Sequence, residues 1–284
     1  IAQVFQFPVI YDTMTVYDNL AFPLRNMNTP EYKVDPKVRE IADILDLTPL
    51  LSRKAKNLTA DEKQKVSMGR GLVRDDVSAI LFDEPLTVID PQLKWKLRRK
   101  LKEIHERFNI TMIYVTHDQL EASTFADKIA VMYDGQVVQF GTPRELFEKP
   151  AHTFVGYFIG SPGMNFMSVT HRAGNVMFGE LPLPVNEAVS RSVAAAGSSN
   201  IKLGIRPEFI TVSQTPKENS VPIEVVNLQD LGTYSLLSFT LNGQLFKARL
   251  PEGHAPIGDA AHAVFSDQHI ALYVDEYLVE IGHE

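Results

Sequence analysis

The sequence contains no cysteine, which excludes disulfides, thiolate catalysis and cysteine-ligated zinc. No apolar run approaches the roughly 18 to 20 residues that a membrane-crossing helix needs. The formal net charge is −7, so the chain has no excess of basic residues, which a nucleic-acid-binding surface requires. The eight histidines are scattered, without an H-E-x-x-H or other paired metal spacing. What remains is a chain of 284 residues, which is long enough for one or two domains with cores of their own.

The phosphate-binding motif G-x-x-x-x-G-K-[ST] is also absent, and the sequence contains no Gly-Lys pair. That glycine-rich loop cradles nucleotide phosphates and supplies a lysine to them. The chain begins with a strand-like run, residues 1–6, that has no initiator methionine. We therefore expect the sequence to start inside a domain.

Polar side chains follow two short apolar runs. Asp83 ends the run 79–83, Glu84 comes directly after it, and His117 follows the run 111–116. If both runs are parallel strands, their carboxyl ends meet at the sheet edge where open α/β folds bind ligands. Asp83 could there hold a hydrated Mg²⁺, and Glu84 could polarise a water against a γ-phosphate. Two buried strands that end in solvated carboxylates would give the same pattern, but the ordered pair favours a nucleotide hydrolase core.

Several segments resemble the ATP-binding subunits of ABC transporters, and the resemblance extends from residue 1 to the end of the chain. It covers the glutamine loop at Gln6, the signature segment at 58–66 and 69–73, the Walker B strand at 80–84, the D-loop at 86–90, the switch histidine His117 and the closing hairpin at 133–143. Residues 158–166 and 203–208 resemble, more particularly, the ATPase subunits of importers for sugars, polyols and glycerol phosphate.

The resemblance implies an α/β fold followed by an all-β region. Residues 1–165 are expected to form an N-terminally incomplete ABC ATPase domain of the P-loop NTPase class, with a helical subdomain at about 10–76. Residues 166–284 are expected to form a regulatory domain of the OB-like, TOBE type. Helical spacing at 34–45 and 91–108 agrees with the first part.

Short alternating runs separated by Gly, Pro, Asn and Asp agree with the all-β part. They lie at 202–205, 223–226, 236–241 and 271–274. Asn242-Gly243 is typical of a β-hairpin turn. The low-complexity stretch 194–199 predicts an exposed loop.

The resemblance also implies ATP and Mg²⁺ as cofactors and gives four residues a part in hydrolysis. Gln6 would sense the metal and the water, and Asp83 would hold the metal through water. Glu84 would act as general base or would position the water. His117 would contact the γ-phosphate.

Four more residues are implied as nucleotide contacts. Thr59, Asp61 and Gln64 lie in the signature segment, and Asp90 lies where the D-loop should touch an opposite subunit.

The signature segment departs from the family pattern. Thr59 keeps a hydroxyl, but Ala60 and Asp61 replace two glycines that let backbone amides approach a partner's γ-phosphate at a helix N-terminus. A carboxylate near a triphosphate repels it. Either Asp61 points away and the segment still works poorly, or the ATP site that it completes is degenerate. We favour the second interpretation, which implies a heterodimer with a subunit whose signature is intact.

The expected function is that of an ATP-binding subunit of an ABC importer, which couples ATP hydrolysis to uptake of a sugar, polyol or glycerol-phosphate-like solute. The alternative is a catalytically degenerate, regulatory subunit paired with an active ATPase. A DNA-repair or ribosome-associated ATPase of the same superfamily is disfavoured by the acidic balance and the β-rich tail. The full-length subunit is expected to be a transport-coupled ATPase, whereas the chain as printed, without a phosphate loop, is expected to be inactive.

The implied partners are a second ATPase subunit, two transmembrane permease subunits and, indirectly, a solute-binding protein. A heterodimer is favoured over a homodimer, and no nucleic acid is expected. The implied location is peripheral, on the cytoplasmic face of the inner membrane. The helical subdomain contains five apolar residues that could line the groove for the permease. They could equally form the subdomain's own core. These residues are Tyr11, Met14, Tyr17, Leu20 and Phe22.

Overall fold

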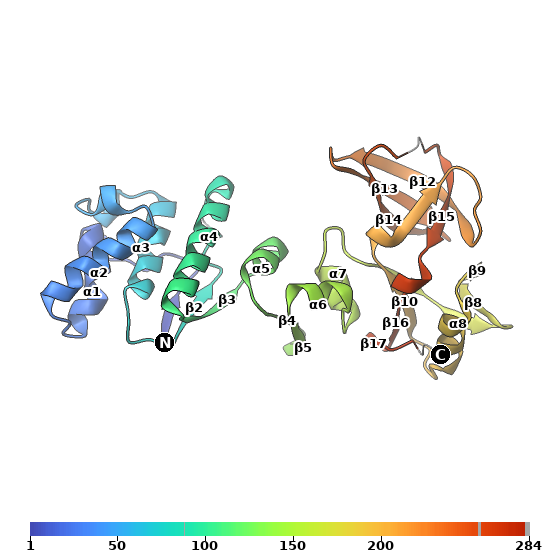
Figure 1. The fold of residues 1–284 in the computed structure, drawn as a ribbon, viewed down its shortest axis with the longest axis horizontal. Helices are drawn as coiled ribbons and strands as arrows, with labels where there is room; N and C mark the ends of the chain where they lie inside the picture. Colours follow the sequence, from blue (N-terminus) through green and yellow to red (C-terminus); the bar gives the residue numbers. More distant parts are fainter. Residues whose placement is uncertain (88, 255–256, 282–284) are drawn as a thin grey trace. The chain divides into compact units, whose positions relative to one another are not determined.

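The computed structural model describes residues 1–87, 89–254 and 257–281 (Figure 1). The chain divides into two compact units, Ile1–Ala126 and Asp127–Glu284. No helix among the described residues has both the length and the apolar character to cross a bilayer. The division between the units precedes the domain boundary expected at residue 165, which stays a prediction.

The first unit contains a parallel sheet with the strand order β1-β2-β3. Its strands are β1 (Ala2–Val4), β2 (Ala79–Asp83) and β3 (Thr111–Val115). Ile80 pairs with Ala2 on one side and with Met112 on the other. The two strands expected from the apolar runs are therefore confirmed, although β3 ends one residue earlier than expected. Because all three strands run in the same direction, the residues that follow them lie at one edge of the sheet.

The helices of the first unit pack into one core with this sheet. They are α1 (Val16–Asn26), α2 (Glu31–Ile44), α3 (Ala60–Leu72), α4 (Pro91–Phe108) and α5 (Gln119–Phe125), with short 3-10 turns η1 (Thr48–Leu50) and η2 (Ala55–Asn57). Leu20, Ile41 and Leu45 are fully buried where α1, α2 and α3 meet. Gly69 permits this packing, because a Cβ atom there would lie 2.5 Å from Leu20 Cδ2. The helical spacing at 34–45 and 91–108 is confirmed.

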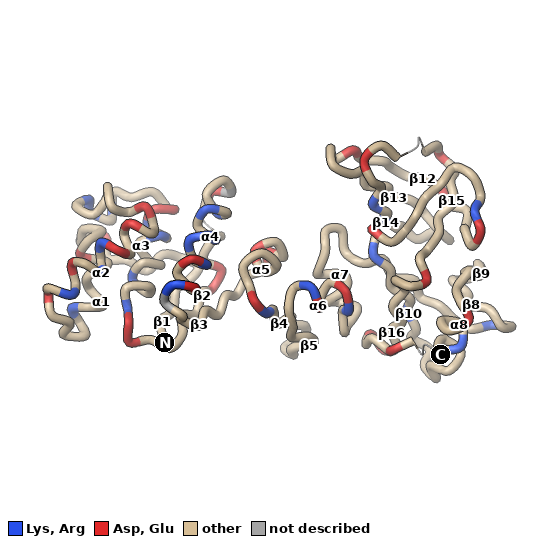
Figure 2. Tube along the Cα trace, viewed as in Figure 1, with Lys and Arg blue, Asp and Glu red and all other residues tan. Residues whose placement is uncertain are grey.

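Positions occupied by Lys or Arg and by Asp or Glu are interspersed along these helices, as the blue and red segments of the Cα trace show (Figure 2). Some of them join elements that are far apart in the sequence, since Lys100 Nζ lies 2.7 Å from Asp46 Oδ1. Exposed ion pairs of this kind each contribute little to stability.

The second unit begins with a hairpin and two short helices. These elements are β4 (Ile129–Tyr133), β5 (Gln136–Gly141), α6 (Pro143–Glu148) and α7 (Thr153–Phe158). Asp134 and Gly135 both have positive φ, of 48° and 75°, which suits the two-residue turn between right-twisted strands. The hairpin expected at 133–143 is thus present, with its turn at residues 134 and 135.

The rest of the second unit is rich in strands. One sheet has the order β17-β16-β10-β6, another β11-β15-β12-β13-β14, and a third β7-β8-β9. The strands are β6 (Asn165–Ser168), β7 (Thr170–Arg172), β8 (Asn175–Phe178), β9 (Leu181–Leu183), β10 (Ile201–Ile205), β11 (Ile210–Ser213), β12 (Ser220–Asp230), β13 (Tyr234–Leu241), β14 (Gln244–Pro251), β15 (Ala260–Phe265), β16 (Ala271–Val274) and β17 (Tyr277–Val279). Short 3-10 turns η3 (Pro207–Phe209) and η4 (Asp267–His269) connect some of them.

The predictions for this region hold with one exception. The expected short strands are present, and Asn242-Gly243 forms the turn between β13 and β14. The prediction of a loop at 194–199 is partly wrong, because Ala194 and Ala195 are the last residues of α8 (Glu187–Ala195). Alanine favours a helix, and the buried Val189 and Val193 hold one face of α8 on the core.

Candidate functional site

Gln6, Glu84 and His117 meet at the carboxyl edge of the parallel sheet, each within two residues of the end of its strand. His117 Nδ1 lies 2.9 Å from Glu84 Oε1. Gln6 Nε2 donates to the other carboxylate oxygen of Glu84, at 3.5 Å. Three candidate residues from distant parts of the sequence are thereby brought into one cluster centred on the Glu84 carboxylate.

The backbone of Glu84 adopts an unusual conformation. Its φ is 44°, in the left-handed region that costs energy for a residue with a side chain. The Glu84 N–H donates to Val115 O at 2.9 Å, which ties the residue to the end of β3. Thr87 Oγ1 donates to Glu84 O at 3.1 Å and lies 3.2 Å from Glu84 Oε2. These bonds hold the strained residue with its carboxylate toward Gln6 and His117.

The contact between Glu84 and His117 shifts the pKa of both groups. The hydrogen bond with His117 lowers the pKa of the Glu84 carboxyl, and the same bond raises the pKa of the His117 imidazole. The carboxylate is therefore ionised at neutral pH, and the imidazole holds its proton to higher pH than usual. The His117 side chain is 75% exposed, so the pair is open to solvent.

We expect a titration of His117, followed by NMR, to show a pKa above the ordinary value of about 6.5. Because a raised pKa means that the pair favours the protonated imidazole, its stabilising contribution is complete below about pH 6.5 and is lost as the pH rises through the raised value. On the acid side, the contribution is lost as the pH falls through the lowered pKa of Glu84. Glu84→Gln should move the His117 pKa back toward about 6.5.

His171, in the second unit, is the internal reference for this titration. Its resonances should not respond to Glu84→Gln. A His117 titration that is the same with and without the Glu84 carboxylate would show that the two groups are not in contact in solution.

Asp83 precedes Glu84 and is exposed at the end of β2. Carboxylate and amide oxygens are ligands that Mg²⁺ accepts, and this ion keeps several waters and takes substrate phosphate oxygens instead of needing a full protein cage. Within the described residues, no group of three His, Cys, Asp or Glu side chains could hold a metal by itself. The carboxylate of Asp83 and the amide oxygen of Gln6 are therefore donor types that suit Mg²⁺.

The N-terminus of α3 is closed by its own side chains. Thr59 is the N-cap residue, and a capping box joins it to Glu62. The Thr59 N–H donates to Glu62 Oε2 at 2.8 Å, and the Thr59 hydroxyl donates to Asp61 Oδ1. Asp61 therefore folds back onto the cap and leaves its charge in the first turn of α3. The hydroxyl and the amide of Thr59 are both engaged within the chain.

Gln64 and Asp90 also have partners inside the chain. Gln64 is fully buried, and its Nε2 donates to Phe5 O at 3.0 Å, next to Gln6 in the sequence. Asp90 caps α4 by accepting from Gln92 N at 2.8 Å. In the described part of the chain, no contact joins Thr59, Asp61 or Asp90 to the cluster of Gln6, Glu84 and His117. Their roles as nucleotide contacts stay predictions.

Two residues that matter to the site were not singled out from the sequence. The Thr87 hydroxyl donates a hydrogen bond to Glu84 O, three residues earlier in the sequence. A threonine at this spacing can make such a bond but need not, so the sequence alone did not indicate it. Glu121 is buried, 3% exposed, and accepts a hydrogen bond from Thr116, the residue before His117. Its position four residues after His117, in the first turn of α5, was the signal that could have indicated it.

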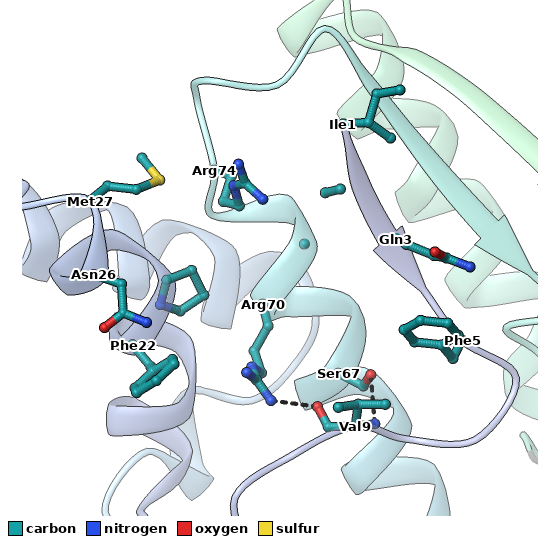
Figure 3. Close-up of a pocket in the computed structure, with 13 residues that line it drawn as sticks. Ile1, Gln3, Phe5, Val9, Phe22, Asn26, Met27, Ser67, Arg70 and Arg74 are labelled. Carbon is teal, nitrogen blue, oxygen red and sulfur yellow. Dashed lines mark hydrogen bonds between the residues drawn. The ribbon is translucent and has the colours of Figure 1, made fainter.

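A cavity of about 420 Å³ lies beside β1, between the segment that follows it and helices α1 and α3 (Figure 3). Phe5, Val9 and Phe22 are among its lining residues. Arg70 donates to Val9 O at 2.6 Å, and Ser67 Oγ accepts from Val9 N at 3.1 Å. The cavity therefore combines an apolar wall with a guanidinium group that is held in place.

The five apolar residues expected either to face a partner or to form the core are not buried to the same extent. Leu20 is fully buried, and Tyr17 packs partly buried against the same core, so for these two the core interpretation is correct. Phe22 lines the cavity, and Tyr11, 42% exposed, packs on it with ring centroids 4.8 Å apart. Met14 is partly buried.

Two family models match the second unit of the chain. The MalK OB fold domain matches residues 160–210, and the TOBE domain matches residues 203–272. Both matches agree with the β-rich region that begins at β6.

Similar proteins are found among ATP-binding proteins of transporters. The trehalose/maltose import ATP-binding protein MalK of Thermococcus litoralis is 41% identical over 255 residues, which cover 87% of this chain and 68% of that protein. The sn-glycerol-3-phosphate import ATP-binding protein UgpC of Cupriavidus necator is 36% identical over 284 residues, 97% of this chain and 77% of that protein. The ABC transporter ATP-binding protein y4oS of Sinorhizobium fredii is 41% identical over 243 residues, 86% of this chain and 64% of that protein.

The chain thus spans between 64% and 77% of the lengths of these relatives. Among solved structures, cbiO1 of Clostridium perfringens, part of the ABC transporter complex cbiONQ, is 27% identical. It aligns with a TM-score of 0.48 over 52% of this chain and 59% of that chain.

Proposed function

Because the chain belongs to the ATP-binding subunits of ABC importers of the sugar and glycerol-phosphate type, we propose that it binds ATP and Mg²⁺ and couples ATP hydrolysis to solute uptake. The solute is a sugar, a polyol or a glycerol-phosphate-like compound. The observation that carries the proposal is the Glu84 carboxylate, which lies 2.9 Å from His117 Nδ1 and adjacent to Asp83 at the carboxyl edge of a parallel sheet.

The residues of this edge divide the chemistry among them. Bound Mg²⁺ supplies charge neutralisation to phosphate oxygens, and Asp83 and Gln6 would hold it. Glu84, as an ionised carboxylate, accepts a hydrogen bond from the attacking water and orients it. His117 fixes the Glu84 carboxylate and adds positive charge at the site. Since no phosphate-loop motif occurs in the sequence, these residues account for the metal and the water but not for the cradle of the phosphates.

The direct test is solute-stimulated ATP hydrolysis by the assembled transporter, with the complete ATP-binding subunit, in lipid vesicles. We expect hydrolysis and uptake to rise together with one solute of the proposed classes. Asp83→Asn should raise the Mg²⁺ concentration required for half-maximal turnover, whereas the control Asp35→Asn, at an exposed position on α2, should not. An assembly that imports its solute without consuming ATP would contradict the proposal.

The membrane partner is proposed to dock at the cavity beside β1. Support comes from the apolar residues Phe5, Val9 and Phe22 next to the anchored Arg70, because apolar walls with a few fixed polar groups are typical of binding sites. Two transmembrane permease subunits would then hold the protein peripherally on the cytoplasmic face of the membrane. A solute-binding protein would act through the permease and not through this chain.

The second ATPase subunit is proposed to be a different polypeptide with an intact signature segment. Support comes from the closed cap of α3, where the Thr59 hydroxyl donates to Asp61 and the Thr59 amide donates to Glu62. Phosphate binding at a helix N-terminus needs free donors and no opposing charge. At the α3 cap the hydroxyl and the amide of Thr59 are engaged within the chain, and Asp61 places a negative charge in the first turn, so the cap is poorly suited to a nucleotide held by the partner.

The double substitution Ala60→Gly with Asp61→Gly is expected to increase ATP turnover severalfold. It removes a negative charge beside the phosphates and reopens the backbone approach, at a helix-propensity cost of about 1 kcal/mol per glycine. Steady-state ATPase assays of the assembled transporter measure the effect. Asp61→Asn is the matched control, because it removes the charge but keeps a side chain. A purified native complex with two copies of this chain, or no gain from the glycines, would defeat the heterodimer.

A further inference from the structure

Glu121 is a buried carboxylate that the proposed function does not use. It lies in the first turn of α5 and is 3% exposed. Its Oε2 accepts from the Tyr114 hydroxyl at 3.0 Å and from Thr116 Oγ1 at 3.1 Å. Its Oε1 lies 3.5 Å from Lys94 Nζ, on α4. A buried carboxylate persists only when it is paired and hydrogen-bonded, and Glu121 meets both conditions.

Hydrogen bonds join Glu121 to the residues on either side of His117 in a closed ring. Thr116 Oγ1 donates to Glu121 Oε2 at 3.1 Å, the Glu121 N–H donates to Asp118 Oδ1 at 3.1 Å, and the Asp118 N–H donates to Thr116 Oγ1 at 3.0 Å. Thr116 and Asp118 are the two sequence neighbours of His117. The ring therefore holds the backbone on both sides of the histidine.

His117 itself has few restraints. It lies between the end of β3 at Val115 and the start of α5 at Gln119, and its side chain is 75% exposed. Its described hydrogen bond is the one with Glu84. Because an exposed side chain gains little orientation from packing, its direction depends on the backbone that the ring holds.

Charge and protonation favour a stable ring. Lys94 balances the charge of Glu121 and lies one turn into α4, where its N–H donates to the carbonyl of the cap residue Asp90. Burial raises the pKa of the Tyr114 hydroxyl, and the charge of Glu121 raises it further. Tyr114 therefore stays protonated as a donor to Glu121 at neutral pH.

We propose that Glu121 is the positioning residue of His117, which it orients toward Glu84 through the ring with Thr116 and Asp118. Glu121 touches neither substrate nor metal and acts only through the histidine. The inference rests on the proposed function, since that function assigns His117 a part in ATP hydrolysis.

The test opens the ring at Thr116. Thr116→Val removes the hydroxyl with almost no change in volume, and Thr116→Ser restores it. The control Thr124→Val removes a hydroxyl outside the ring, on α5, which donates to Leu120 O. By NMR of the full chain, we expect the order parameter of the His117 amide to fall from roughly 0.85 to below about 0.7 in Thr116→Val only. In the assembled transporter, kcat should fall roughly tenfold in this variant with an unchanged KM for ATP, as expected for a misplaced group. Thr116→Ser should recover both quantities.

The two readouts separate failure of this inference from failure of the proposed function. An unchanged order parameter in Thr116→Val, or an equal loss in Thr124→Val, would overturn the ring. A mobile His117 with normal kcat would overturn the positioning role in catalysis. A wild-type transporter that imports solute without ATP hydrolysis would overturn the proposed function, and the catalytic role of His117 would fall with it. The order parameter would still decide whether the ring orders the histidine.

Discussion

Glu84→Gln should lower ATP turnover of the assembled transporter by about 10² to 10⁴-fold, the range typical of lost acid–base catalysis. The amide that replaces the carboxylate cannot take a proton from the attacking water. The substitution also removes the negative charge that lies 2.9 Å from His117 Nδ1 in the wild-type protein. Nucleotide binding should survive, because Asp83 and Gln6 are untouched and would still hold Mg²⁺. Single-turnover and equilibrium binding measurements with ATP distinguish the two effects.

Glu103→Gln is the matched control for Glu84→Gln. Glu103 lies on the exposed face of α4, 61% exposed, with Arg99 at 3.4 Å. Loss of this carboxylate should leave turnover unchanged, which separates the loss of a negative charge from the loss of the catalytic group. Near-normal turnover in Glu84→Gln would remove this glutamate from the catalytic role.

Arg206→Ala should lower the free energy of unfolding by about 3 to 5 kcal/mol, the largest stability change that we expect in the second unit. Arg206 is 2% exposed. It donates from Nε to Phe147 O at 2.8 Å and from a terminal nitrogen to Ile159 O at 2.6 Å. Its guanidinium carbon lies 3.8 Å from the centroid of the Phe147 ring. Alanine would leave two carbonyls unpaired and a cavity, and it would remove the bonds from Arg206, which follows β10, to the segment of α6 and α7.

Urea unfolding followed by far-ultraviolet circular dichroism measures this loss. Arg172→Ala is the control, because Arg172 is 71% exposed, lies 3.7 Å from Glu180 and should contribute no more than about 0.5 kcal/mol. Arg206→Lys should recover only part of the stability, since an ammonium group cannot match the planar fork that serves both carbonyls. A loss below about 1 kcal/mol in Arg206→Ala would mean that the buried bonds are replaced by water.

The sequence by itself determined the elements whose signals are local. The apolar runs that became β2 and β3, the helical spacing of α4 and the Asn242-Gly243 turn all depend on neighbouring residues, because backbone geometry sets their periods of 2 and 3.6 and their turn chemistry. The meeting of Glu84 and His117 at one sheet edge also follows from local signals. Parallel strands bring their carboxyl ends together whatever the length of chain between them.

The tertiary structure alone decided which side chains touch. The left-handed backbone of Glu84, which is tied to Val115 O, and the burial of Gln64 against Phe5 O depend on register and on packing between distant segments. The bond of the Thr59 hydroxyl to Asp61 is local, but the sequence left the direction of the Asp61 side chain open. Glu121 shows the same limit most clearly. In the sequence it is an ordinary glutamate near a helix start, and only the approach of α4 to α5 places Lys94 beside it. Contacts of this kind cannot be predicted from periodicity, because a shift of one residue in register or a fraction of a helical turn exchanges one partner for another.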